Sequence, residues 1–407
     1  MPVYGYTFRD PSGGTQKGTA DAESEEVLRK RFEEQGFTIT EVTVIKSRSA
    51  KQKSYGKVKL THLSIFCRQF STMVDAGVSL VRCLDVLGQQ TQDPKLKKIL
   101  IEVGERVESG ESLSRAMQRH PRTFSNLFIG LIRAGEIGGV LEESLQRLSH
   151  FLEKDVELRR KVKAAMTYPV LVLILSTGIV IFLVSWFIPQ WAAILIDLGL
   201  KGDDIPAPTQ FLIDLSDLIK YRWWMILLTA GITIFSWKMF TSTRFGRRVA
   251  DRMRLKVPVF GKLHHKVCMA RFSRTMGTLL TSGVPILQAM ETVAGTVGNT
   301  IMSDAVLEAR ARIREGDRIG EPLEASKLFP PMVVHMIGVG EESGSLDFML
   351  QKIADFYESE VESTLQSLTA ALEPIMIVGL GFIVGFIVVS MFLPLVRVIE
   401  RLSSGGE

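Results

Sequence analysis

Two short segments of the chain share an unusual pattern of glycine and glutamate. AGEIGGVLEESL begins at Ala134 and VGEESGSLDFML begins at Val339, a spacing of 205 residues. Glu136 and Glu341 are the residues in these segments that could do chemistry, because a tight turn does not require a carboxylate. Two interpretations stay open for both glutamates: an ion pair with a neighbouring helix, or a contact with a partner protein.

The glycines of the same segments are typical of a turn between two helices. Gly135 and Gly340 are predicted to occupy the left-handed position that ends a helix. Gly139 and Gly344 then allow the chain to reverse tightly, and the acidic residues that follow are favourable in the first turn of the next helix. These four glycines are therefore predicted to be structural.

Other reactive residue types form no recognisable site in this sequence. The three cysteines form no CxxC pair, so reduced and buried thiols are expected. His264 and His265 are adjacent and would point about 100° apart on a helix, so a solvated surface pair is expected rather than a metal site. The sequence holds no GxxxxGK[ST] loop and no triad spacing. We therefore expect no enzyme activity, no metal and no cofactor.

Hydropathy and proline spacing predict three membrane spans. The chain has 407 residues, 46% of them hydrophobic, and a mean hydropathy of +0.18, which is too apolar for an ordinary soluble protein. Spans are predicted at 169–189, 223–240 and 374–394; the first and third each hold 19 residues without an ionisable side chain, about 28 Å of helix. Pro169 and Pro374 stand at the membrane boundary, where a kink or break is expected.

The distribution of basic residues predicts how the spans are oriented. Lys and Arg are concentrated before the first span and after the second, whereas the connection 190–222 is acidic on balance. The N-terminus is therefore expected in the cytoplasm, and this connection and the tail 395–407 in the periplasm. Arg247, Arg248 and Arg252 are expected to face anionic lipid, because the aromatic interleaving of nucleic-acid binders is absent.

A duplicated unit organises most of the chain. Early residues of the unit match at an offset of 206 and later residues at an offset of 205, as in Phe66 and Phe272, Gly77 and Gly283, Gly139 and Gly344, and Pro169 and Pro374. Each copy has the helical periodicity of a bundle and ends in a span. The predicted fold is a mainly α, polytopic membrane protein with two homologous cytoplasmic helical bundles.

The predicted organisation also includes a small α+β domain at the N-terminus. Its strands are expected at VYGYTFRD, Thr15–Thr19 and TITEVTVI, and its helix at EEVLRKRFEEQ. In chain order we expect this domain at 1–46, a basic flexible linker at 47–60, bundle 1 at 61–168, the first span, the periplasmic connection, the second span, a basic juxtamembrane segment at 241–270, bundle 2 at 271–373, the third span and the tail.

The segments between the repeated turns and the far side of the membrane are predicted to be long helices. From 140 to 188 and from 345 to 393 the chain is expected to form a nearly continuous helix of 49 residues, about 70 Å long. The third span also carries Gly381 and Gly385, spaced as GxxxG, which lets helix backbones approach closely in lipid. Self-association and packing against a hydrophobic helix of another chain both stay open.

These features together resemble a known family. FCRQFSTMVDAGVSL and FSRTMGTLLTSGVPI, the two GE…G…L turns, KVKAAMTYP before the first span and ALEP before the third carry the resemblance. They are similar to the bacterial inner-membrane platform proteins of type IV pilus assembly and type II secretion, the PilC/GspF-like family. The resemblance covers nearly the entire chain, and KVKAAMTYP with the short periplasmic connection resembles the pilus branch more closely.

The resemblance implies a non-enzymatic scaffold of the bacterial inner membrane that forms a homo-oligomer. The implied partners are a hexameric secretion or pilus ATPase, pilin-like subunits, other inner-membrane assembly proteins and membrane lipids, and no nucleic acid. The implied function is to couple the ATPase to insertion of pilin into the fibre. The alternative is the platform protein of a type II secretion system. An oligomeric transporter is a remote alternative, because the first and third spans lack ionisable groups at mid-membrane.

Overall fold

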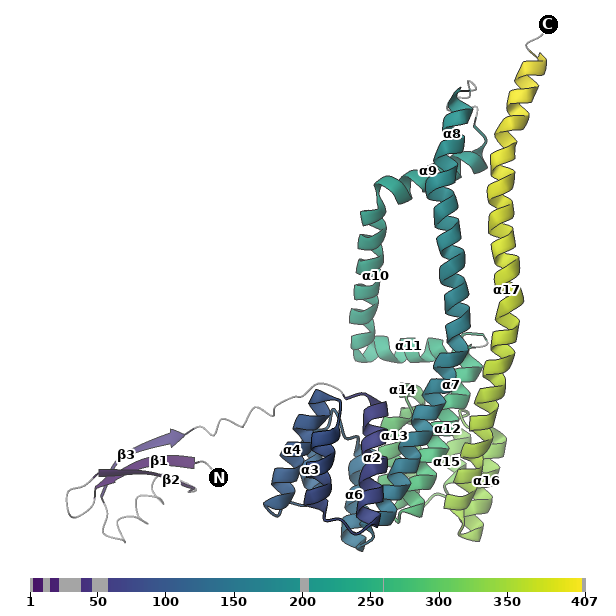
Figure 1. Cartoon of the computed structure of the whole chain (residues 1–407). Coiled ribbons are helices and arrows are strands. Elements are labelled where there is room, and N and C mark those ends of the chain that lie inside the picture. Colours follow the sequence, from purple (N-terminus) through teal and green to yellow (C-terminus); the bar gives the residue numbers. More distant parts are fainter. Residues whose placement is uncertain are drawn as a thin grey trace.

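Two helical bundles lie at one end of a pair of very long helices (Figure 1). The computed structural model describes residues 3–9, 15–21, 38–45, 58–197, 205–258 and 260–404. The part described is helical except for one small sheet near the N-terminus.

The N-terminal sheet has three antiparallel strands in the order β2-β1-β3. The strands are β1 (Val3–Arg9), β2 (Thr15–Asp21) and β3 (Thr38–Ile45), where the sequence predicts them. The helix predicted at 25–35 and the linker up to residue 57 lie outside the described residues.

The first bundle is built from amphipathic helices whose apolar faces meet. Its elements are α2 (Leu60–Asp75), α3 (Leu80–Gln90), α4 (Pro94–Glu108), α5 (Leu113–Gln118), α6 (Asn126–Gly138) and the start of α7 (Leu141–Phe182). The α2 helix buries Phe66 and Phe70, whose rings stack with centroids 5.4 Å apart. The Asp93 side chain accepts hydrogen bonds from two backbone N–H groups at the start of α4, as expected of an N-cap.

The second bundle repeats the first, helix for helix. Its elements are α12 (Phe260–Thr281), α13 (Ile286–Thr296), α14 (Thr300–Glu315), α15 (Gly320–Ala325), α16 (Pro331–Ser343) and the start of α17 (Leu346–Ser404). Asn299 caps α14 at the position where Asp93 caps α4. The buried residues of both bundles join in one hydrophobic core, so the two repeats pack against each other.

The turns between α6 and α7 and between α16 and α17 place their left-handed residue later than predicted. Gly139 (φ +69°) and Gly344 (φ +68°) end the two helices in the left-handed conformation. Gly135 and Gly340 lie inside α6 and α16, so the prediction that they stop the helices is wrong.

Gly135 and Gly340 instead allow consecutive helices to approach closely. A Cβ atom on Gly135 would lie 2.5 Å from Ser144 Oγ, and one on Gly340 would lie 2.9 Å from Leu346 Cα. Both distances are shorter than normal van der Waals contacts. The absence of a side chain is thus required by the tertiary packing, not by the backbone conformation.

At the two membrane-boundary prolines, where a kink or break is expected, the helices are not broken. Helix α7 passes through Pro169 and continues through the π-helical segment η1 (Leu183–Phe187) into α8 (Ile188–Asp197). Helix α17 passes through Pro374 in the same way. A proline removes one backbone hydrogen bond, but the helix that follows it is charge-free and lies in an apolar phase, where no water competes with its other hydrogen bonds.

Within the described part of the chain, three helical segments are long and apolar enough to cross a membrane: Leu141–Asp197, Trp223–Ser242 and Leu346–Ile399. The connection predicted at 190–222 is largely helical, because α8 runs to Asp197 and α9 (Ala207–Tyr221) follows. The predicted tail is helical as well, up to Ser404.

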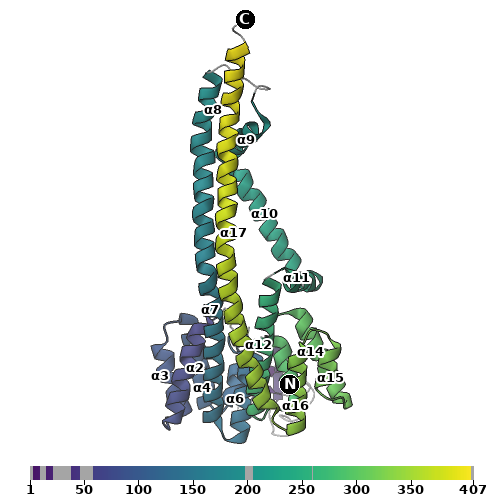
Figure 2. The ribbon, with the colours of Figure 1, turned by 90° about the vertical axis from the view of Figure 1, so that its right-hand side faces the viewer.

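Helix α17 lies beside α7 and its continuation through η1 and α8, and the two are joined at two levels (Figure 2). The lower cluster, on the bundle side of the spans, contains Leu158, Leu263, Val361, Leu365 and Leu368. The upper cluster, toward the opposite end, contains Val184, Ile188, Leu212 and Ile387.

The second span is packed quite differently from the other two. Helix α10 (Trp223–Ser242) has no buried residue. Helix α11 (Arg244–Lys256) follows at once and lies across the foot of α10 (Figure 1). The chain therefore leaves this span along the plane of the membrane surface before it enters bundle 2.

Candidate functional site

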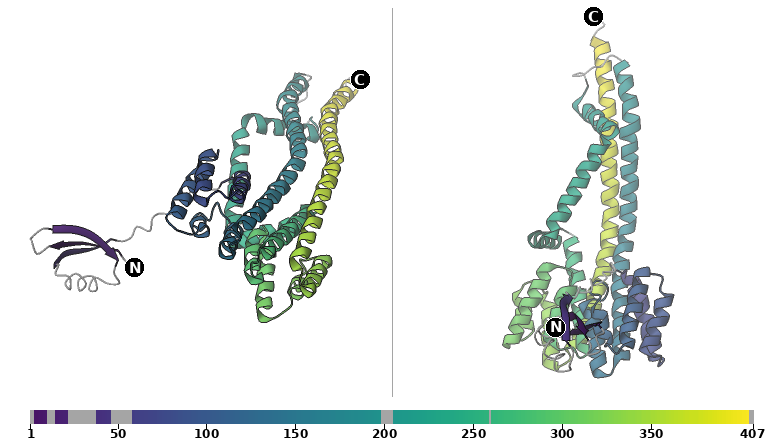
Figure 3. Two further views of the ribbon diagram at one scale, coloured as in Figure 1. Left: turned by 60° about the horizontal axis from the view of Figure 1, so that its bottom comes forward. Right: turned by 90° about the vertical axis from the view of Figure 1, so that its left-hand side faces the viewer.

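The two repeated turns lie at the end of the bundles that is farthest from the spans. Helix α7 begins at Leu141 and α17 at Leu346, each 28 residues before the proline at the membrane boundary, about 42 Å of helix. Figure 3 shows both bundles at the same end of the long helices. Both turns therefore face away from the membrane, where a partner could reach them.

Glu136 and Glu341 perform the same intramolecular role in the two repeats. Glu136 Oε2 accepts a hydrogen bond from the backbone N–H of Ser114 (3.2 Å), in the first turn of α5. Glu341 Oε1 and Oε2 accept from the backbone N–H of Ile319 (3.2 and 3.0 Å), at the start of α15. A negative charge at a helix N-terminus is favourable. Each carboxylate thus holds a short helix against the helix that ends at the turn.

The exposed side chains of the two turns differ in polarity. In the first repeat Ile137 is 81% exposed and Val140 is 48% exposed. The equivalent positions in the second repeat are Glu342 and Ser345. An apolar surface at the tip of bundle 1 is therefore replaced by a polar one in bundle 2. The sequence signal that could have indicated this surface is Ile137, an isoleucine beside two glycines in a turn.

Arg147 joins the two bundles. It lies on α7, and its Nη1 donates hydrogen bonds to the carbonyl of Thr281, at the end of α12, and to Ser282 Oγ (3.4 Å). Its Nη2 contacts Glu143 Oε2 at 3.1 Å on the same helix. A cation at a helix C-terminus is favourable, so this contact stabilises the interface between the repeats.

The two repeats contain an equivalent ion pair, but its surroundings differ. Arg68 Nε lies 2.8 Å from Glu153 in bundle 1, and Arg274 Nε lies 2.9 Å from Glu358 in bundle 2. The Arg68 side chain is 70% exposed, whereas that of Arg274 is 12% exposed and also contacts Asp355. The same pair is therefore solvated in one repeat and largely buried in the other.

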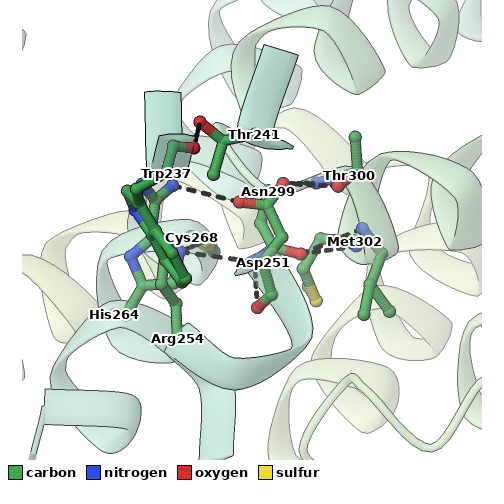
Figure 4. Close-up of polar contacts among 10 residues, drawn as sticks. Trp237, Thr241, Asp251, Arg254, His264, Cys268, Asn299, Thr300 and Met302 are labelled. Carbon is green, nitrogen blue, oxygen red and sulfur yellow. Dashed lines mark hydrogen bonds and ion pairs between the residues drawn. The ribbon is translucent and has the colours of Figure 1, made fainter. Parts of the chain in front are cut away.

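A polar junction fixes α11 to bundle 2 (Figure 4). Asp251 on α11 is buried; its carboxylate accepts from both the N–H (3.0 Å) and the hydroxyl of Thr300, and Arg254 Nη1 lies 3.0 Å away. Asn299 donates to the Asp251 carbonyl at 3.1 Å. Burial alone would raise the pKa of Asp251, but the hydrogen bonds from Thr300 and the nearby charge of Arg254 hold it below its usual value.

The basic residues predicted to face lipid lie on the exposed surface of α11. Arg247, Arg248 and Arg252 are all exposed. Arg248 Nη2 also pairs with Asp304 of α14 at 3.0 Å, so one of the three binds bundle 2. Phe245 is exposed as well and adds apolar surface to the helix.

His264 and His265 are not the solvated surface pair that the sequence suggested. Both are half-buried because α12 packs against α11, α13 and α17. His264 Nε2 lies 3.4 Å from Asn299 Nδ2 and 3.9 Å from Cys268 Sγ, whereas His265 Nε2 lies 2.7 Å from the carbonyl of Leu328. Burial and the charge of a nearby arginine lower the pKa of His264. The described residues contain no group of three side chains that could hold a metal ion.

The three cysteines are free and buried. Burial raises the pKa of all three thiols, that of Cys268 to about 11. They are therefore protonated at neutral pH and unreactive, as expected of thiols in a core.

Gly381 and Gly385 lie on a face of α17 that the rest of the described chain leaves uncovered. A Cβ atom on either glycine would have no neighbouring atom within 4 Å. Val378 and Phe382, on the same stretch of helix, are largely exposed. This face is free to contact lipid or another helix.

The family model described as "Type II secretion system (T2SS), protein F" matches twice, at 66–189 and 272–394, and the model of the N-terminal domain of that protein matches at 1–43. The internal repeat is thereby confirmed.

Three curated relatives match over nearly their whole length. "Type IV pilus assembly protein PilC" of Thermus thermophilus is 43% identical over 99% of this chain and 100% of the relative. The protein of the same name from Myxococcus xanthus is 39% identical over 94% of this chain and 92% of the relative. "Type II secretion system protein F" of Vibrio cholerae is 31% identical over 99% and 100%, respectively.

Proposed function

Because the chain belongs to the type II secretion system protein F family of inner-membrane platform proteins, we propose that it is the platform of a type IV pilus assembly machine. The observation that carries the choice of branch is identity: 43% and 39% to two pilus assembly proteins, against 31% to a secretion protein. The secretion platform is the second candidate.

The proposed role is structural and not enzymatic. A hexameric ATPase would supply the work, pilin-like subunits would receive it, and other inner-membrane assembly proteins would complete the machine. The N-terminus and both bundles are proposed to lie in the cytoplasm, and the α8–α9 connection and the C-terminal end in the periplasm. The basic residues on α11 support this orientation, because cytoplasmic flanks are rich in Lys and Arg.

We propose that the ATPase contacts the bundle ends that carry the two repeated turns. These ends lie farthest from the membrane, and the exposed apolar tip of bundle 1, Ile137 and Val140, is suited to a protein contact. Glu136 and Glu341 take part by positioning, because their carboxylates fix the helices that lead into the turns. The long helices α7 and α17 then connect this surface to the membrane.

We propose that the uncovered faces of the spans contact other membrane helices. No residue of α10 is buried, and Gly381 and Gly385 of α17 leave room for a close backbone approach. The occupant is either a second copy of this chain or the hydrophobic helix of a pilin-like subunit. A Gly381→Leu, Gly385→Leu variant is expected to lose oligomer formation or pili; unchanged oligomer size and unchanged piliation would contradict both versions.

An Ile137→Asp variant tests the proposed ATPase surface. The host that encodes the chain is deleted for it and then supplied with wild type, with Ile137→Asp, or with Ile65→Asp, which alters another exposed isoleucine of the same bundle. Wild type and Ile65→Asp are expected to restore pili and to retain the ATPase in affinity purification. Ile137→Asp is expected to insert in the membrane but to lose both.

Other outcomes would refute parts of this proposal. Normal ATPase retention by Ile137→Asp would exclude the tip of bundle 1 as the contact. A deletion strain that keeps its pili but fails to secrete folded proteins would assign the chain to the secretion branch.

A further inference from the structure

A cavity lies between the first long helix and bundle 2, close to the bundle-side surface of the membrane. Its volume is about 520 Å³, within the range of small-molecule sites. It is lined by α7, by the end of α11 and by α12. None of the roles described above uses it.

The cavity lies at the level of the lipid headgroups. Met166, one of its lining residues, stands three residues before Pro169, where the charge-free part of the first span begins. Arg254 and Val257 line it from the end of α11, the helix that lies across the foot of α10. Two independent markers of the membrane boundary therefore coincide at this cavity.

The lining combines an apolar wall with a strongly basic rim. Val162, Met166 and Phe260 contribute apolar surface, and the larger part of the exposed lining is apolar. The charged lining residues are Arg159, Lys163, Arg254 and Arg271, and no aspartate or glutamate is among the lining residues.

The nearby acidic groups neutralise only part of this charge, and Asp251 pairs with Arg254 at 3.0 Å. Asp155 pairs bidentately with Arg159 (3.1 and 2.9 Å) and only distantly with Arg271 (3.7 Å). Arg271 Nε is buried and has no hydrogen-bond partner within the described chain. Lys163 forms no ion pair with any described acidic residue. A buried guanidinium N–H without an acceptor is unfavourable, and a bound anionic group could supply that acceptor.

We propose that this cavity binds an anionic phospholipid of the cytoplasmic leaflet. The phosphate lies at the basic rim, where it can accept hydrogen bonds from Lys163 and from the unpaired Nε of Arg271. The upper part of an acyl chain lies against Met166 and Phe260. Basic pockets beside transmembrane helices on the cytoplasmic side suit such headgroups. The site depends on membrane insertion of α7 and α10 but not on the pilus or secretion role.

The test measures lipid retention by the purified full-length chain. The protein is extracted in mild detergent, and native mass spectrometry follows its complexes with cardiolipin, phosphatidylglycerol and phosphatidylethanolamine. Wild type is expected to retain the two anionic lipids preferentially. Lys163→Gln is expected to weaken this binding about fivefold, because one charge near the membrane surface contributes about 1 kcal/mol.

Two further variants separate the cavity from general surface charge. Arg160→Gln removes a neighbouring exposed cation of α7 that does not line the cavity and is expected to leave retention unchanged. Val257→Trp fills the cavity without changing the charge and is expected to displace the lipid. Retention at the wild-type level by both Lys163→Gln and Val257→Trp, or equal binding of phosphatidylethanolamine, would overturn the proposal.

Discussion

The two bundles have the same helices in the same order, yet they are attached to the membrane differently. Bundle 1 leads into a span only through α7, whereas bundle 2 is connected through α11 at its beginning and through α17 at its end. The polar junction of Asp251, Asn299 and Thr300 also has no counterpart among the described residues of bundle 1. The two repeats therefore have similar folds, but equivalent residues contribute differently to stability because the repeats are connected to the membrane differently.

Replacing the equivalent arginines should give the largest difference in stability between the two bundles. Arg274→Ala leaves the carboxylate of Glu358 largely buried without its partner, which is expected to cost about 3 kcal/mol. Arg68→Ala removes a solvated pair and is expected to cost at most about 1 kcal/mol. Thermal unfolding of the full-length chain in detergent, followed by circular dichroism, measures the difference. Equal shifts in melting temperature would show that the ion pair between Arg274 and Glu358 is hydrated.

Alanine at the close-approach glycines should affect both bundles alike. Gly135→Ala and Gly340→Ala place a Cβ atom against the next helix, and such overpacking is expected to cost about 2 kcal/mol. Gly130→Ala and Gly338→Ala are matched controls in the same helices, because a Cβ atom there meets nothing within 4 Å. The controls are expected to stabilise by up to about 1 kcal/mol through helix propensity. A destabilised control would mean that an unseen partner covers that face.

Removing the charge of the capping glutamates should have the smallest effect, again alike in both bundles. Glu136→Gln and Glu341→Gln retain an acceptor for the backbone N–H but lose its charge, so a loss of about 0.5–1 kcal/mol each is expected. The melting temperature of each single variant checks this. If one variant lost ATPase binding without losing stability, that glutamate would contact the partner directly.

Features with a regular period in the sequence were the ones that could be predicted. The three spans and the repeat follow from hydropathy and from offsets between matching residues, and the structure and the family model agree with them. The rule that glycine ends a helix selected Gly135 and Gly340, the first glycines of each turn, because it does not include the approach of the next helix.

Contacts between distant segments could not be predicted in this way. The backbone N–H of Ser114, which donates to Glu136, is 22 residues away along the chain, and nothing in the sequence marks it. Proline at the membrane boundary was expected to kink or break α7 and α17, but both helices continue through it, and their hydrogen bonds beyond it lie in an apolar phase without competing water. In each case tertiary packing or the surrounding solvent decided between locally equivalent outcomes.

The unbroken helix α17 has a mechanical consequence. The lower cluster holds it near Val361–Leu368, and the upper cluster holds it near Ile387. From the middle of the lower cluster, the bundle end of the helix at Leu346 and the level of Ile387 are each about 30 Å away. With the lower cluster as its fulcrum, the helix is a rocker with two nearly equal arms. A push of about 3 Å at the bundle end would then shift the level of Ile387 by about 3 Å in the opposite direction, together with the parts of η1, α8 and α9 that the upper cluster packs against it.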